Sequence, residues 1–346
     1  MRQVDGESKF TLPGSYTLVY QSNRLTNGTF QSFGLIHTKI FVAIVKSLQE
    51  AIRAELNGLD WQQLNLFEQI TNESIQVKIN LKDITAPNHY ADAVKAAKEL
   101  MGLVVNLKKT NAPKGYVSFR TLFMGVDEPF KFEGRTVIII HILKSVAREI
   151  ISLDKNRDGN AINFTKYFYE IAMSTKSKFT IRLYILISSW KNKGGFYISL
   201  DELRKTLDVK EHEYLNYGKF REKVLLPAQK ELEKIGDCWF NTGHDGFENK
   251  SGKKVIGLNF KVLTKENEEK NKQKIDHLRQ MLILHAAFTN EQFLKLKPIL
   301  NRPHLIDSII VKAVDLMSRR TDENGKPIEN KVAYITKSLL NNFLQT

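Results

Sequence analysis

The segment from residue 219 to residue 234 separates into two faces when it is drawn as an ideal α-helix. One face is apolar and repeats every four residues: Phe220, Val224, Ala228 and Leu232. The opposite face, within an arc of about 60°, carries the cations Lys219, Lys223, Lys230 and Lys234. Ammonium groups in such a row can bind phosphate oxygens or the acceptor atoms of base edges. Solvation of an ordinary exposed helix face is the alternative use for each lysine taken alone.

Two further residues of this segment bear on that chemistry. Arg221 falls toward the edge of the apolar arc, yet its planar fork suits the two acceptor atoms of guanine best. We therefore keep it as a candidate base-contacting residue beside Lys219 and Lys223. Pro227 lacks an N–H and its ring clashes with the carbonyl of Lys223, so we expect the helix to kink there.

The loop at 249–254 is a second cationic segment, and it carries Lys250, Lys253 and Lys254 around Gly252. A glycine turn with three cations is typical of a hairpin tip that contacts phosphates, and a solubilising turn is the alternative. Each phosphate that such a lysine neutralises should add roughly −0.9 to the slope of log K against log salt.

The whole chain is basic. Its 346 residues contain 52 Lys and Arg against 38 Asp and Glu, which gives a net charge of +14. Such an excess favours a polyanionic partner. Apolar residues form 42% of the chain and aromatic residues 10%, which is a globular composition, and the length suits two or three domains.

Nothing in the sequence indicates secretion or a membrane span. Cys238 is the only cysteine, which excludes a disulfide framework and a multi-thiolate zinc site and fits a reducing compartment. The first residues lack the apolar core of a signal peptide. The apolar run at 137–143 is far shorter than a membrane span of about 20 residues. We expect a cytoplasmic protein with no membrane partner.

Common catalytic and cofactor-binding motifs are missing from the sequence. There is no GxxxxGK[ST] phosphate loop, no GxGxxG after a strand, no HExxH and no GxSxG elbow. Residues 154–159 match the opening of a calcium-binding EF-hand loop, but the twelfth position holds Thr165 in place of the bidentate Glu. A polar turn between domains is the better interpretation. We expect no catalytic residue, no cofactor and no metal.

The elements around the two cationic segments form a pattern that occurs twice. In the first copy we expect helices at 30–56, 81–85, 90–101 and 143–152, and strands at 75–79, 103–107, 116–120, 130–132 and 137–142. In the second copy we expect helices at 178–191, 200–207 and 219–235, and strands at 196–198, 238–240 and 255–262. Ser199 and Glu202 form a capping box that begins the middle helix of the second copy.

The two copies also match in sequence. Ile79–Ile84 parallels Ile198–Leu203, and Ala96–Leu100 parallels Ala228–Leu232. Helix, strand, helix, helix and hairpin in this order make a winged helix, whose third helix fits the major groove while the hairpin lies along the flanking backbone. We predict an α+β, mostly helical protein with two tandem winged-helix domains, at 10–152 and 160–263, and a C-terminal helical extension. Because such modules also bind proteins, DNA binding is favoured more for the second copy than for the first.

Several stretches of the second copy resemble the plasmid replication initiators of the iteron-binding Rep family. They are Phe179–Leu186, Ile198–Arg204, Phe220–Leu232, Gly252–Val255 and Leu258–Phe260. The most distinctive elements are Arg-Leu-Tyr at 182–184 and Val-Leu-Leu-Pro-Ala-Gln-Lys-Glu at 224–231. The resemblance covers about residues 10–263 as two tandem winged helices.

The resemblance implies a sequence-specific initiator without enzymatic activity, in the cytoplasm of a bacterium that carries the plasmid. Members of the family bind directly repeated sites in a plasmid origin, help to melt an adjacent AT-rich segment, and recruit the host initiator and the replicative helicase. The first winged helix supplies dimerisation and further DNA contacts, and dimers often repress their own promoter. The implied partners are double-stranded DNA, a second copy of the chain and those host proteins.

The resemblance also extends the set of candidate DNA-binding residues. Lys219, Arg221 and Lys223 match the basic part of the family's reading helix, whereas Glu222 stands where relatives commonly carry a cation. The full expected set is Lys219, Arg221, Lys223, Lys230, Lys250, Lys253, Lys254, Arg182, Arg204, Lys95 and Lys98.

Residues 264–346 lie beyond the resemblance and predict a helical extension. Amphipathic stretches indicate helices at 264–285, 289–296, 303–317 and around 332–343, with a capping box formed by Thr289 and Gln292. Two roles are open for this extension. It is either a module that binds a partner such as the helicase machinery or an appendage that packs on the second winged helix.

Two other functions are alternatives to replication initiation. A transcriptional repressor would bind a palindromic site as a two-fold dimer, so a footprint on an inverted repeat rather than on direct repeats would favour it. A nicking or strand-transfer enzyme using one of the eleven tyrosines would cleave supercoiled origin DNA with a divalent metal and form a covalent tyrosine adduct. We expect neither cleavage nor an adduct.

Overall fold

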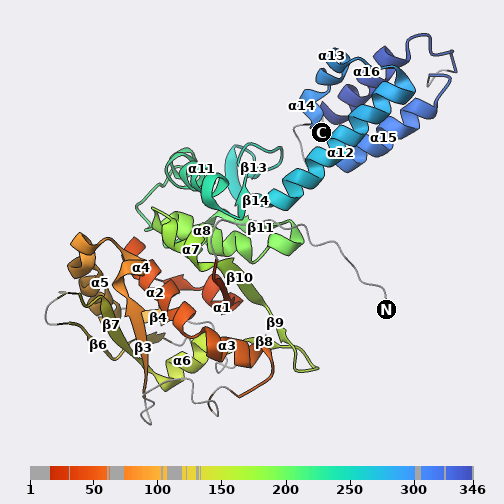
Figure 1. Cartoon of the computed structure of the whole chain (residues 1–346). Coiled ribbons are helices and arrows are strands. Elements are labelled where there is room, and N and C mark those ends of the chain that lie inside the picture. Colours follow the sequence, from red (N-terminus) through yellow and green to blue (C-terminus); the bar gives the residue numbers. More distant parts are fainter. Residues whose placement is uncertain are drawn as a thin grey trace, which may run out of the picture. The chain divides into compact units, whose positions relative to one another are not determined.

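The computed structural model forms two compact units (Figure 1). It describes residues 16–30, 32–60, 62, 74–102, 104–106, 119–121, 123–129, 132, 134–300, 305–322 and 325–344. The larger unit contains residues 1–242 and 249–262, and the smaller unit contains residues 243–248 and 263–346. Both winged helices belong to the larger unit.

The first winged helix is built on a three-stranded antiparallel sheet with strand order β3-β7-β6. Strand β3 pairs with β7 along its whole length, from Ser74 opposite Leu143 to Asn80 opposite Val137. Alternate residues of β3 are buried, as expected for a strand with one face on the core, where α2 packs. The elements are α2 (Leu35–Ser47), α3 (Gln49–Leu56), β3 (Ser74–Asn80), α4 (Leu81–Ile84), the 3₁₀ helix η2 (Pro87–His89), α5 (Tyr90–Gly102), β6 (Gly125–Asp127), β7 (Val137–Leu143) and α6 (Lys144–Ile151).

The second winged helix repeats this plan. Its sheet has the order β11-β14-β12, with β13 paired to β14 as a hairpin. In both copies the last strand therefore lies between the first strand and the second strand of the sheet. This shared order supports the duplication inferred from the sequence. The elements are α8 (Lys178–Ser188), the 3₁₀ helix η3 (Lys191–Lys193), β11 (Gly195–Ser199), α9 (Leu200–Thr206), α10 (Tyr217–Phe220), the π-helical η4 (Arg221–Leu225), α11 (Leu226–Ile235), β12 (Cys238–Phe240), β13 (Glu248–Ser251) and β14 (Lys254–Thr264).

The first copy differs from the expectation in two places. The helix expected at 30–56 begins only at Leu35, since Phe30 lies in a strand, and it is two helices, α2 and α3, which meet at Leu48. The strand expected at 130–132 is wrong at Phe132, and β6 supplies the third strand of the sheet instead. Residues 103, 107, 116–118, 130 and 131 of the expected strands lie outside the described residues. A second small sheet, β2-β4-β5, contains β2 (Thr29–Phe30), β4 (Val104–Asn106) and β5 (Phe119–Thr121).

A long-range strand pair not anticipated from the sequence joins the start of the described chain to the segment between the two copies. Strand β1 (Leu18–Ser22) pairs antiparallel with β10 (Phe164–Phe168). The helix α1 (Asn23–Thr26) follows β1, and α7 (Tyr169–Ser174) follows β10. Pairing across so many residues leaves no local pattern in the sequence, because either strand alone is a short mixed segment.

The segment expected as a polar turn is the tip of a small hairpin. Strands β8 (Asp154–Lys155) and β9 (Ala161–Ile162) pair with each other. Between them, Asn156 Oδ1 accepts hydrogen bonds from the amides of Asp158 and Asn160, at 3.0 and 2.9 Å. Local turn formation therefore accounts for the polar residues that imitate a calcium loop.

The two winged helices meet around the buried side chain of Arg182 on α8. Its Nη2 donates hydrogen bonds to the carbonyl oxygens of Gly28 and Thr206, at 2.6 and 2.9 Å, and its Nε donates to the same Thr206 oxygen. The guanidinium also lies over the ring of Phe30, 4.6 Å from its centroid. Gly28 belongs to the first copy and Thr206 is the last residue of α9 in the second, so one side chain bridges both.

This placement corrects the expectation that Arg182 contacts DNA. Only 9% of the residue is exposed, and its donors are used by backbone carbonyls. Burial lowers the pKa of Arg182 to about 10, which still leaves the side chain charged at neutral pH. Arg182 is a structural residue in this fold.

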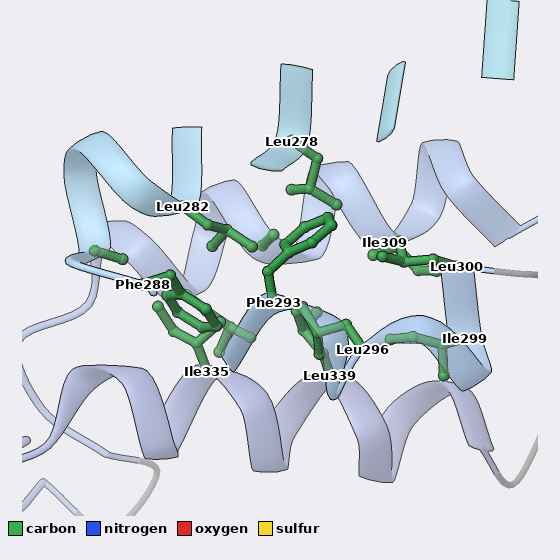
Figure 2. Packing of buried hydrophobic residues seen from close by; sticks show 13 residues of the cluster. Leu278, Leu282, Phe288, Phe293, Leu296, Ile299, Leu300, Ile309, Ile335 and Leu339 are labelled. Carbon is green, nitrogen blue, oxygen red and sulfur yellow. The ribbon is translucent and has the colours of Figure 1, made fainter. Parts of the chain in front are cut away.

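The C-terminal unit has a hydrophobic core of its own (Figure 2). The expected helices are present, and the capping box is formed: Thr289 Oγ1 accepts from the Gln292 amide, and Gln292 Oε1 accepts from the Thr289 amide. The helices are α12 (Lys265–Ala286), α13 (Asn290–Leu294), α14 (Lys297–Leu300), α15 (Ile306–Ser318) and α16 (Lys331–Leu344). Their fully buried side chains include Leu278, Leu282, Leu296, Ile299, Ile309, Ala313, Ile335 and Leu339.

Replacing Arg182 tests its structural role. In Arg182→Met the carbonyls of Gly28 and Thr206 lose their buried donor, so the free energy of unfolding should fall by about 2–4 kcal/mol. Urea unfolding followed by circular dichroism measures this change. The control Arg53→Met removes an exposed arginine and should alter stability by less than about 0.5 kcal/mol. Equal stability of the two variants would contradict the bridge.

Candidate nucleic-acid interface

The third helix of the second winged helix runs without a break from Tyr217 to Ile235 through α10, η4 and α11. Asn216 begins it, because its side-chain oxygen accepts from the Gly218 amide at 2.7 Å. Just before Pro227 the helix is π-helical, and the Leu226 amide bonds to the carbonyl of Arg221. The disturbance expected at Pro227 is thus taken up by a wider turn, in which the missing proline donor is tolerated.

The helix buries one face and exposes cations on the other. The buried residues are Phe220, Val224, Leu225, Ala228 and Leu232. Lys219, Lys223 and Lys230 are exposed. The burial of both Val224 and Leu225 reflects the extra residue in the π-helical turn, which rotates the following turns by up to about 100° relative to an uninterrupted helix. The expectation that the lysines of 219–234 all lie within one arc of the helix is therefore wrong across η4. Lys219 and Lys223 still lie on the same face.

Lys223 carries its own counter-charge. Its Nζ lies 2.8 Å from Glu222 Oε1, and more than half of each side chain is exposed. The hydrogen bond between them raises the pKa of the Lys223 ammonium and lowers the pKa of the Glu222 carboxyl. Glu222 therefore stays ionised beside the cation.

Arg221 points toward the end of the sheet rather than straight outward. It is half-buried, and its Nη2 lies 3.5 Å from Thr242 Oγ1, just after β12. Thr242 also donates to Gln229 Oε1 through both its amide and its hydroxyl, at 2.9 Å each. This arrangement braces the third helix against the sheet and leaves Arg221 at the edge of the cationic face.

Arg204 holds the loop that leads into the third helix. Its guanidinium donates to the carbonyls of Glu213 and Tyr214, at 2.6 and 2.8 Å, and lies 5.6 Å from the centroid of the Phe220 ring. The expected DNA contact of Arg204 conflicts with this use of its donors. In the structure it is a positioning residue, a role for which no local pattern of residues is a signal.

The hairpin of β13 and β14 is the wing of the second winged helix. Gly252 and Lys253 form its two-residue turn, and Gly252 has a φ of +59°, which residues with a side chain rarely adopt. The tip is exposed throughout 249–254, so it presents the cations Lys250, Lys253 and Lys254.

In the first winged helix, α5 corresponds to the third helix of the second copy, and it carries fewer cations. Lys95 is exposed there. Lys98 is also exposed, but its Nζ donates to Glu128 Oε1 at 2.6 Å. This copy thus presents a weaker cationic face than the second.

Metal-ligand clusters, long apolar helices and the single thiol were considered among the residues that the structure describes. Among them, no three or more His, Cys, Asp or Glu side chains gather as a metal site would require. No described helix combines the length and apolar character of a membrane span. The thiol of Cys238 is fully buried, and burial raises its pKa to about 12, so it is a poor nucleophile.

Two winged helices in tandem, one of them with an exposed cationic third helix and a cationic wing, define a DNA-binding protein of the winged-helix class. Each of the two winged helices matches a separate family model. The first winged-helix model of the initiator replication proteins matches residues 18–188, and the second winged-helix model of the initiator Rep proteins matches residues 199–262. The chain belongs to the initiator Rep protein family.

A solved structure described as the Pi initiator protein in complex with iteron DNA is similar to this chain, with 16% sequence identity and a TM-score of 0.49. The similarity covers 73% of this chain and 99% of the other. A search of curated proteins finds no match.

A double substitution tests the cationic face of the third helix. Lys219→Ala with Lys223→Ala removes both exposed cations that share one face, so affinity for the cognate DNA should fall about 10- to 100-fold. Gel-shift titration measures it, and circular dichroism checks the fold. The control, Lys295→Ala with Lys337→Ala, removes the same charge from exposed positions of the C-terminal unit. A similar loss in the control would contradict a specific face.

The wing is tested through the salt dependence of binding. If its cations neutralise phosphates, alanine at all three positions should make the slope of log K against log salt shallower by about 2–3. Fluorescence anisotropy between about 50 and 200 mM salt measures that slope. The substituted residues are Lys250, Lys253 and Lys254. The charge-matched control residues are Lys272, Lys295 and Lys337. An unchanged slope in the wing variant would show that the wing does not touch the backbone.

Proposed function

We propose that the protein initiates plasmid replication by binding directly repeated origin sequences, the iterons, as duplex DNA. The observation that carries this proposal is the pairing of an exposed cationic third helix with a cationic wing in a member of the initiator Rep family. The class of site to be tested is therefore a set of short direct repeats in an origin.

The proposed binding mode follows from the shape of the second winged helix. The third helix enters the major groove, where Lys219 and Lys223 reach acceptor atoms on base edges, and Arg221 reaches them from the edge of the same face. The wing lysines contact the flanking phosphates and fix the register. Lys230, beyond η4, meets the backbone rather than a base. Lys95 and Lys98 of the first copy add contacts to a neighbouring segment of the duplex.

The same proposal includes the later steps of initiation. Bound copies distort the duplex beside the repeats, and an AT-rich segment opens because its pairing is weakest. The host initiator and the replicative helicase are then recruited, and a dimer formed through the first winged helix represses the protein's own promoter. The protein acts without enzymatic activity of its own, on a plasmid in the bacterial cytoplasm.

The C-terminal unit suits a contact with one of those partners. It has a closed core, yet it exposes large apolar side chains on its helices. These are Leu284, Leu294, Val311, Val314 and Leu344. Exposed apolar residues that adjoin one another are a feature of protein-binding surfaces, and Val311 and Val314 lie one turn apart on α15.

Nuclease footprinting on the DNA around the gene tests the proposed function. The full-length protein should protect a set of short direct repeats, with no strand cleavage in the presence of Mg²⁺. Protection of one inverted repeat would support the repressor instead. Nicking of supercoiled DNA with a covalent tyrosine adduct would support the enzyme. Protection of no discrete sequence would overturn DNA-site recognition altogether.

A further inference from the structure

Leu215 is an exposed apolar side chain at the entrance of the third helix. Its exposed fraction is 79%, which is higher than that of any other large hydrophobic residue in the described part of the chain. It directly precedes Asn216, whose side chain begins the helix. The other exposed large hydrophobic residues of the second winged helix, Tyr197 and Ile256, lie on strands β11 and β14 rather than in the loop before the third helix.

The loop holds Leu215 outward in a fixed way. Tyr214 has a φ of +48°, a strained value for a residue with a bulky side chain. Its ring packs edge-on against Phe179, 6.1 Å between ring centroids. Arg204 binds the carbonyls of Glu213 and Tyr214. Backbone strain that the surroundings enforce is found where a side chain must be presented to a ligand.

The chemistry of the neighbouring surface indicates which ligand that is. Residues at the N-terminus of a recognition helix are the ones that contact base edges in the major groove. In that groove the only apolar group is the C5-methyl of thymine. Gly218 has no side chain, and the exposed cations Lys219 and Lys223 follow it along the helix. A lone leucine beside cations offers too little apolar area for a protein partner, but it matches one methyl group.

We propose that Leu215 is a specificity-determining residue that contacts the C5-methyl group of one thymine in each bound repeat. The inference rests on the proposed function, since it requires the third helix to enter the major groove. It adds a base-reading contact that is apolar, beside the polar contacts of Lys219 and Lys223.

Substituting deoxyuridine for thymine tests the contact directly, because uracil lacks only the methyl group. The probe is a duplex that carries the repeat protected in the footprint, with each thymine replaced in turn. For the unmodified protein, one replacement should weaken binding about fourfold, the value of one buried methyl-sized group. For Leu215→Ala, the same replacement should have no effect, while Leu215→Met should keep part of it.

Controls separate this contact from other effects. Leu59→Ala removes an exposed leucine that follows α3 and should retain the full sensitivity to deoxyuridine. The melting temperature of Leu215→Ala should equal that of the unmodified protein, because the side chain makes few contacts.

Two outcomes would overturn the inference while the proposed function stands. One is a repeat that binds tightly but tolerates deoxyuridine at every thymine. The other is a Leu215→Ala protein that remains as sensitive to deoxyuridine as the unmodified protein, so that the substitution weakens binding to the thymine probe and to every deoxyuridine probe by the same factor. Failure of the protein to protect any repeat would instead refute the proposed function.

Discussion

The buried guanidinium of Arg182 is the interaction on which the arrangement of the two winged helices depends. A charged group taken out of water is stable only when its donors are satisfied, and here the acceptors come from both copies, at Gly28 and Thr206. Neither copy alone can supply that set. The bridge therefore favours one relative placement of the two winged helices within the larger unit, and with it the spacing between their two third helices.

The second winged helix shows how neighbouring structure fixes a surface that the third helix alone would not define. The π-helical turn before Pro227 changes which residues face inward, and Thr242 and Gln229 hold the far side of the helix to the sheet. Arg204 sets the loop at its start. Arginines in this module thus act mainly on the backbone around the helix, and lysines face the solvent where a polyanion would lie.

Much of this architecture could be predicted from the sequence, since apolar spacing and capping residues are local signals. The helices of the C-terminal unit, the third helix of the second copy and its hairpin all follow from such patterns. The pairing of β1 with β10 could not be predicted, because it depends on contacts between distant segments. The burial of Arg182 was missed for a different reason: arginine is mostly exposed, and only the assembled fold provides carbonyl acceptors for it. Leu215 was overlooked because a single apolar residue in a polar loop has no period.

The carboxylate of Glu222, next to the Lys223 ammonium, has a consequence for how the protein finds its target. A genome offers a vast excess of unrelated duplex, and each cation that contacts phosphate strengthens the non-specific binding to it. An acidic neighbour reduces the net charge of this part of the helix and so weakens that sequence-independent attraction. A larger share of the binding free energy then has to come from contacts that depend on the base sequence.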